Sequence, residues 1–115
     1  MKRLVLAVLI LVAFFSCSND VLQEEVLTRH EDGNKKEVRY YVKNEDGSKN
    51  YVRETWYYME GMKHLDGPII GGKRNGVFET YYKSGALMSK GTFIDGIREG
   101  EAFTYYENGN VKYQG

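Results

Sequence analysis

The chain has 115 residues, which is enough for one small domain. Its 16 Lys and Arg residues balance 16 Asp and Glu residues, so it lacks the basic excess that nucleic-acid-binding proteins need. A single Cys excludes a disulfide within the chain and a multi-cysteine zinc site, and two His leave little for a histidine-based metal site.

The first residues are typical of an export signal. Two basic residues, Lys2 and Arg3, precede the unbroken apolar run 4–15. This run is shorter than the roughly 20 residues that span a membrane, but it suits a secretory signal peptide. The segment that follows, Phe14-Phe15-Ser16-Cys17, resembles a bacterial lipobox.

That resemblance implies a cleaved signal peptide over 1–16 and a lipid on Cys17. A buried or incidental cysteine is the alternative. We interpret 17–30 as a polar tether, with a short helical turn around 21–27. Cleavage leaves 14 basic against 16 acidic side chains, a net charge of about −2, which disfavours docking on anionic lipid. The expected location is therefore a lipid-anchored position on the outer membrane or the outer face of the cytoplasmic membrane.

A local hairpin is predicted over 31–58, with strands at 36–43 and 50–58 and a turn at Asp46-Gly47. The expected cross-strand pairs are Val42 with Tyr51, Tyr41 with Val52, Tyr40 with Arg53, Arg39 with Glu54 and Val38 with Thr55. Glu31-Asp32-Gly33 is predicted to be another turn.

The remainder, residues 52–115, repeats with a period of 24 residues, in units 52–75, 76–99 and 100–115. Four columns are identical in all three copies: Tyr57, Tyr81 and Tyr105; Tyr58, Tyr82 and Tyr106; Gly61, Gly85 and Gly109; and Gly67, Gly91 and Gly115. Gly72 and Gly96 match in two copies. Compositional bias would not keep one spacing through three copies.

Each copy is predicted to be one β-hairpin. Strands are expected at 77–82, 87–93, 101–106 and 111–114, with turns at Gly61, Gly85 and Gly109 and at Asp95-Gly96. The fold class is therefore all-β, a meander of tandem hairpins in one elongated sheet. We expect the aromatic columns to stack between repeats. Pro68 removes a ladder donor, so its stretch is expected to be an edge or a bulge.

The segments 76–85 and 100–109, with their Tyr-Tyr-x-x-Gly core, resemble the bacterial variant of MORN repeats. The first copy departs from them, with Trp56 where the others have Thr80 and Thr104. Some bacterial proteins with these repeats are labelled antitoxins of toxin–antitoxin pairs, and the wider family suggests binding of lipid headgroups.

Nothing in the sequence indicates catalysis. His64 with Asp66, and His30 with Glu31 and Asp32, lack a third metal ligand within sequence reach, so we interpret them as turn residues. No nucleophile elbow, phosphate loop or calcium loop is present. We therefore expect no enzyme activity, no cofactor, no metal and no small-molecule substrate.

Tyrosines and Trp56 alternate with Lys and Arg, which predicts either cross-strand packing or an aromatic binding face. The binding face would consist of Trp56 with one of the two tyrosine columns, and the sequence does not say which column is outward. The expected function is a membrane-anchored, non-catalytic module that binds a protein partner. The alternatives are an antitoxin or immunity-type protein and a lipid-headgroup binder.

Overall fold

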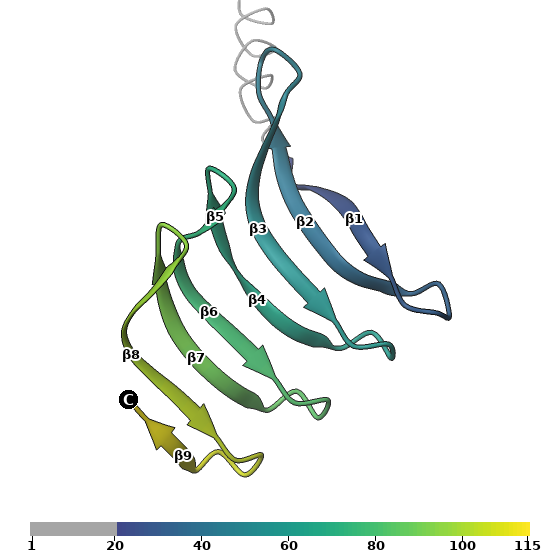
Figure 1. Cartoon of the computed structure of the whole chain (residues 1–115). Helices are drawn as coiled ribbons and strands as arrows, with labels where there is room; N and C mark the ends of the chain where they lie inside the picture. The colour runs from purple at the N-terminus through teal and green to yellow at the C-terminus, as the bar shows by residue number, and fades with distance from the viewer. Residues whose placement is uncertain (1–20) are drawn as a thin grey trace, which may run out of the picture.

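The computed structural model describes residues 21–115, which form one open, curved antiparallel sheet (Figure 1). Its strands are β1 (Gln23–Arg29), β2 (Lys35–Lys43), β3 (Lys49–Tyr57), β4 (Lys63–Ile70), β5 (Lys73–Arg74), β6 (Gly76–Tyr81), β7 (Leu87–Ile94), β8 (Ile97–Tyr105) and β9 (Val111–Gln114). The order β1-β2-β3-β4-β6-β7-β8-β9 follows the chain, and the two-residue β5 pairs with β4 alone. The predicted all-β meander is confirmed.

The predicted turns also agree with the structure. The three turn glycines, Gly61, Gly85 and Gly109, have positive φ angles of 102°, 93° and 92°. A side chain with a Cβ atom is disfavoured there, which explains why glycine recurs at each hairpin tip. Gly72 and Gly96, at the opposite ends of the strands, have φ angles of 80° and 86°.

The register of the β2–β3 hairpin is as predicted for half its length. Val38, Arg39 and Tyr40 face Thr55, Glu54 and Arg53. Beyond Tyr40 the pairing shifts by one residue, so Tyr41 faces Tyr51 and Val42 faces Asn50 instead of the expected partners. A bulge at this point absorbs one residue of β3 and bends the strand, a feature that a turn-based count of residues does not include.

The tether prediction is wrong for the part of 17–30 that the structure describes. Gln23–Arg29 is strand β1, paired antiparallel with β2, and no helical turn forms. Val26 faces Val38 across this pair, and Val38 is fully buried. The adjacent acidic residues Glu24 and Glu25 interrupt the alternation of polar and apolar residues in β1, so the sequence does not show a strand pattern there. The predicted signal peptide and Cys17 lie outside the described residues.

The two faces of the sheet differ in chemistry, because successive side chains on a strand point to opposite sides. The aromatic face carries the buried cluster of Leu65, Ile69 and Phe78, against which Tyr51, Trp56 and Phe93 pack. The polar face carries Thr55 and Asp66, which are 1% and 6% exposed. The polar face also carries the fully buried Val38, which faces Thr55. This one-layer sheet therefore buries an aromatic and aliphatic cluster on one side and a polar network beside Val38 on the other.

Pro68 lies in β4, which is an interior strand, so the prediction of a sheet edge is wrong. Pro68 faces Arg53 on β3, while the β4–β6 ladder contains only Leu65 and Asp66. The ladder on the β6 side thus ends before the residue that has no N–H to donate. The carbonyl of Pro68 still accepts a hydrogen bond from the Asn75 amide at 3.1 Å.

Within residues 21–115 there is no helix long and apolar enough to cross a membrane.

Candidate functional site

The second tyrosine column joins successive hairpins. The Tyr58 hydroxyl donates to the carbonyl of Tyr81 at 2.7 Å, and the Tyr82 hydroxyl donates to the carbonyl of Tyr105 at 2.7 Å. We call this contact the tyrosine clasp. In residues 21–115 no ring of either column stacks on the next ring of that column, contrary to the expected stacking. The hydroxyl, and not the ring face, makes the inter-repeat contact.

The β1–β2 hairpin, which lies outside the 24-residue repeat, makes the same contact. Nε2 of His30 donates to the carbonyl of Tyr57 at 2.8 Å, the same contact one hairpin earlier. The His30 turn also repeats the backbone bonds of the Tyr58 turn, since the amide of Gly33 bonds to His30 as Gly61 bonds to Tyr58. The spacing from His30 to Tyr58 is 28 residues instead of 24, and the ring differs, so a fixed-period search could not find it.

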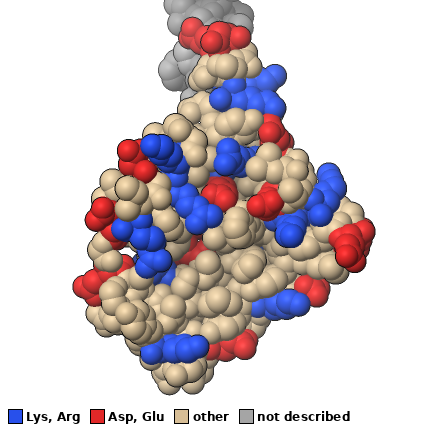
Figure 2. All heavy atoms as spheres, in the orientation of Figure 1, with Lys and Arg blue, Asp and Glu red and all other residues tan. Residues whose placement is uncertain are grey.

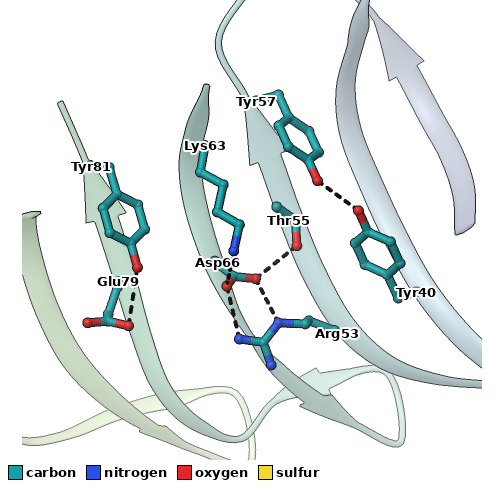
Figure 3. A network of polar contacts seen from close by, with 8 residues as sticks. All are labelled: Tyr40, Arg53, Thr55, Tyr57, Lys63, Asp66, Glu79 and Tyr81. Atoms are coloured by element: carbon teal, nitrogen blue, oxygen red, sulfur yellow. Dashed lines mark hydrogen bonds and ion pairs between the residues drawn. The ribbon is translucent and has the colours of Figure 1, made fainter. Parts of the chain in front are cut away.

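The first tyrosine column lies on the polar face and is partly buried. The Tyr57 hydroxyl lies 2.7 Å from the Tyr40 hydroxyl (Figure 3). Burial, and then the Tyr40 contact, raise the pKa of Tyr57 above its ordinary value. Tyr81 donates to Glu79 at 3.3 Å, and the Tyr105 ring stacks on Phe103 with centroids 6.2 Å apart.

Asp66 is the centre of the polar face (Figure 3). Arg53 donates to both carboxylate oxygens at 2.8 and 2.9 Å, Thr55 donates at 2.8 Å and Lys63 at 3.2 Å. Burial alone would raise the pKa of Asp66, but these donors outweigh it and lower the pKa below its usual range. A carboxylate held ionised by three donors is a structural anchor and has little capacity left to act as a base.

Strand pairing aligns the four hairpins residue by residue. Thr28, Thr80 and Thr104 occupy one position, because each faces the equivalent residue of the returning strand. Trp56, which faces Leu65, occupies the same position in the β3–β4 hairpin. The chain therefore departs from its own pattern at Trp56, and it departs again at His30, where the later hairpins have tyrosine.

Both residues that depart from the pattern, Trp56 and His30, line one pocket of about 440 Å³. It is lined by His30, Lys36, Glu37, Trp56, Tyr57, Tyr58 and His64. We call it the aromatic pocket. The His64 ring stacks on the Tyr58 ring with centroids 4.3 Å apart and lies 6.3 Å from the Trp56 ring. Aromatic walls with a few polar groups are typical of sites that receive an apolar group from a ligand.

Arg74 stabilises the neighbouring part of the aromatic face. The Arg74 guanidinium binds Glu54 through two bonds of 3.1 and 3.2 Å, and it lies over the rings of Phe78 and Phe93 at 4.7 and 5.3 Å. It also lies 5.7 Å from the Trp56 ring. Paired charge and cation–π contact together fix the wall behind Trp56.

A larger hollow of about 580 Å³ lies near the turns of the first two hairpins, but its charged groups are already engaged. Lys35 pairs with Glu24 at 2.8 Å, and Arg29 donates to the carbonyl of Gly33. Figure 2 shows acidic and basic side chains interspersed, without a continuous patch of either sign on the face in view. In the described residues no group of three or more His, Cys, Asp or Glu could hold a metal ion.

Residues 74–95 and 98–115 match the MORN repeat variant family. Two of the four hairpins, β6–β7 and β8–β9, thus match this family. Repeats of this family are generally modules that interact with proteins or membranes, and they are typically non-catalytic. The match begins in β5 and so does not include the aromatic pocket. No curated protein and no solved structure matches the chain.

Proposed function

We propose that this chain is a non-catalytic protein-binding module, held at a bacterial membrane by a lipid on Cys17, that receives an apolar or aromatic side chain of its partner in the aromatic pocket. The observation that carries the proposal is the convergence of the chain's departures from its own repeat. Trp56 and His30 each replace the residue found in other hairpins, and both line the same pocket.

The chemistry of the pocket favours a protein side chain over a lipid headgroup. Trp56, Tyr58 and His64 present ring surfaces, and tryptophan and tyrosine are enriched among the residues that dominate binding energy at protein interfaces. A headgroup site for anionic lipid would need an excess of basic groups. Here Lys36 is accompanied by Glu37, and the mature chain has a net charge of about −2.

The pocket also lies on a rigid support, which makes binding less costly in entropy. Its wall residues come from the interior strands β2, β3 and β4 and from the turns that follow β1 and β3. The Tyr58 ring is held by its own clasp to Tyr81, and His30 is held by its bond to Tyr57. Little ordering is needed when a partner arrives.

The test is site-specific photo-crosslinking of the full chain in its own cells. A benzoylphenylalanine at position 64 lies in the aromatic pocket. The same residue at position 88, which follows the next clasp turn at the equivalent place, is the matched control. We expect a protein to be captured from position 64 and not from position 88. Capture of the same proteins from both positions, or of none from position 64, would contradict the proposal.

A reverting variant separates binding from folding. Trp56→Thr restores the residue that the other three hairpins carry, so the sheet should still form. We expect it to lower capture from position 64 at least tenfold, as loss of a central aromatic contact does. Circular dichroism checks the fold. A captured toxin whose activity the chain blocks would specify the immunity role, whereas capture of lipid alone would favour the headgroup alternative.

A further inference from the structure

Within residues 21–115, three of the four hairpins make the clasp contact and the β8–β9 hairpin does not. His30, Tyr58 and Tyr82 each donate to a carbonyl of the next hairpin. Tyr106 is the next member, with the same turn bonds to Gly109 and Asn110, but in residues 21–115 its hydroxyl has no acceptor and its side chain is 51% exposed. The last hairpin thus presents a donor prepared for one more strand.

The backbone beside Tyr106 is also open within the described residues. Strand β9 pairs only with β8, and Val111 and Tyr113 are 54% and 64% exposed. An unpaired strand edge with exposed apolar side chains is a template for pairing with another chain. The open edge of β9 would pair with a further strand, and the Tyr106 hydroxyl would bond to a carbonyl at the end of that strand. The matching partner is therefore a strand that is followed by a clasp turn.

Strand β1 meets this requirement. It ends at Arg29, directly before the His30 turn, just as β8 ends at Tyr105 before the Tyr106 turn. Each neighbouring pair along the eight-strand path is antiparallel, so β1 and β9 run in opposite directions. Placing β1 of a second copy beside β9 therefore continues the antiparallel sheet without a change of direction.

We propose that copies of this chain associate head to tail, with β9 of one copy pairing with β1 of the next. Repeating the register of the internal hairpins puts Tyr113 opposite Thr28 of the second copy. It also directs the Tyr106 hydroxyl at the carbonyl of Arg29 of that copy, where Tyr82 meets Tyr105 within the chain. The contact does not involve the aromatic pocket and is independent of the proposed function.

The experiment uses the full chain in its membrane, with benzoylphenylalanine at the exposed position 113. We expect crosslinked multiples of the chain, joined from position 113 to the segment around Thr28. These two positions lie at opposite edges of the sheet, roughly 30 Å apart at the spacing of adjacent strands, so a crosslink between them joins two copies. The exposed position 70, which is not on the proposed interface, is the control and should give no such multiples.

Two conservative variants test the role of the clasp. Tyr106→Phe removes only the free hydroxyl. Under conditions where most of the chain is uncrosslinked, it should lower the yield of crosslinked multiples from position 113 about fivefold, which corresponds to the loss of one hydrogen bond. Tyr82→Phe removes an internal clasp and should leave the yield unchanged. Absence of multiples, a crosslink between two β9 strands, or equal yields for Tyr106→Phe and the parent chain would overturn the proposal.

Discussion

At the scale of single residues, Asp66 shows how a one-layer sheet stabilises its polar side. The carboxylate is 6% exposed and receives bonds from Arg53, Thr55 and Lys63. Arg53 and Lys63 remain about half exposed, with 44% and 53% of their side chains accessible, so water still solvates these cations. The network therefore avoids most of the desolvation cost of a fully buried ion pair.

We expect Asp66→Asn to lower the free energy of unfolding by about 2 kcal/mol, because it removes charge-assisted bonds from a buried position. Urea denaturation of the purified protein measures the change. Thr55→Val is the matched control, since it removes one of the three donors and keeps the volume. An Asn variant as stable as the parent would contradict the role assigned to Asp66.

The same residue predicts a pH dependence. The folded-state pKa of Asp66 is lowered, so its contribution to stability is complete above the unfolded pKa of about 4. That contribution is lost as the pH falls through the lower folded-state pKa. We expect urea midpoints to drop as the pH falls below about 4, with a smaller drop in Asp66→Asn. Parallel pH curves for the two proteins would rule out this origin.

At the scale of elements, the two strand glycines Gly67 and Gly91 have different surroundings. A Cβ at Gly67 would lie 2.5 Å from the ring of Phe78, which is 4% exposed. A Cβ at Gly91 would meet only the guanidinium of Arg98, at 3.2 Å, because Ala102 replaces the phenylalanine of the preceding repeat. The first glycine therefore makes room for a buried ring, whereas the second lies beneath a flexible side chain.

We expect Gly67→Ala to lower the free energy of unfolding by about 2 kcal/mol, since an overpacked site has to displace the Phe78 ring. Gly91→Ala should change it by less than about 0.5 kcal/mol, because Arg98 is exposed and can move aside. Thermal or urea denaturation of both variants makes the comparison. Equal losses at the two positions would show that backbone conformation, and not the ring, sets the requirement.

The sequence predicts most elements of this fold because the turn chemistry is explicit. Asp46-Gly47 and the turn glycines Gly61, Gly85 and Gly109 place the hairpins, and most predicted strand bounds agree within one or two residues. The exception is β8, which begins at Ile97 and not at the expected residue 101. The bulge beyond Tyr40 and the strand β1 were missed for physical reasons. A bulge leaves no composition signal, and β1 places Glu24 and Glu25 next to Val26 and Leu27, a mixture that a solvated segment also contains.

The candidate site was only partly predictable. Trp56 was recognised as a departure from the repeat, but its meeting with His30 and His64 depends on how β2, β3 and β4 lie side by side. The tyrosine columns were identified, but their separation into a clasp and a polar-face column depends on hydroxyl directions. Periodicity locates such residues along the chain and carries no information about which atom makes the contact.

At the scale of the whole molecule, four hairpins form one sheet whose first strand begins at Gln23. A lipid on Cys17 would place this sheet close to the membrane, since only Ser18 to Leu22 would separate the anchor from β1. The short connection replaces the longer tether expected from the sequence. Partners would then meet the aromatic pocket near the membrane surface.

We expect the membrane fraction of cells expressing the full chain to contain a species that begins at Cys17 and carries acyl groups. Intact mass spectrometry measures it. The Cys17→Ala variant should be absent from the membrane fraction, because it has no acyl chains and each buried methylene of such a chain contributes about 0.8 kcal/mol to anchoring. An unmodified chain that retains Met1 and is recovered soluble would disprove the lipid anchor. It would not bear on the proposed binding at the aromatic pocket.

The most direct test of the aromatic pocket uses its own fluorophore. Trp56 is the only tryptophan, so its emission reports this site alone. Titration with the partner captured from position 64 should shift the emission to shorter wavelength and protect Trp56 from acrylamide quenching. His30→Tyr, which restores the clasp residue of the later hairpins, should weaken both effects. A complex that forms, by an independent measure of mass, with unchanged Trp56 emission and quenching would contradict binding at this pocket.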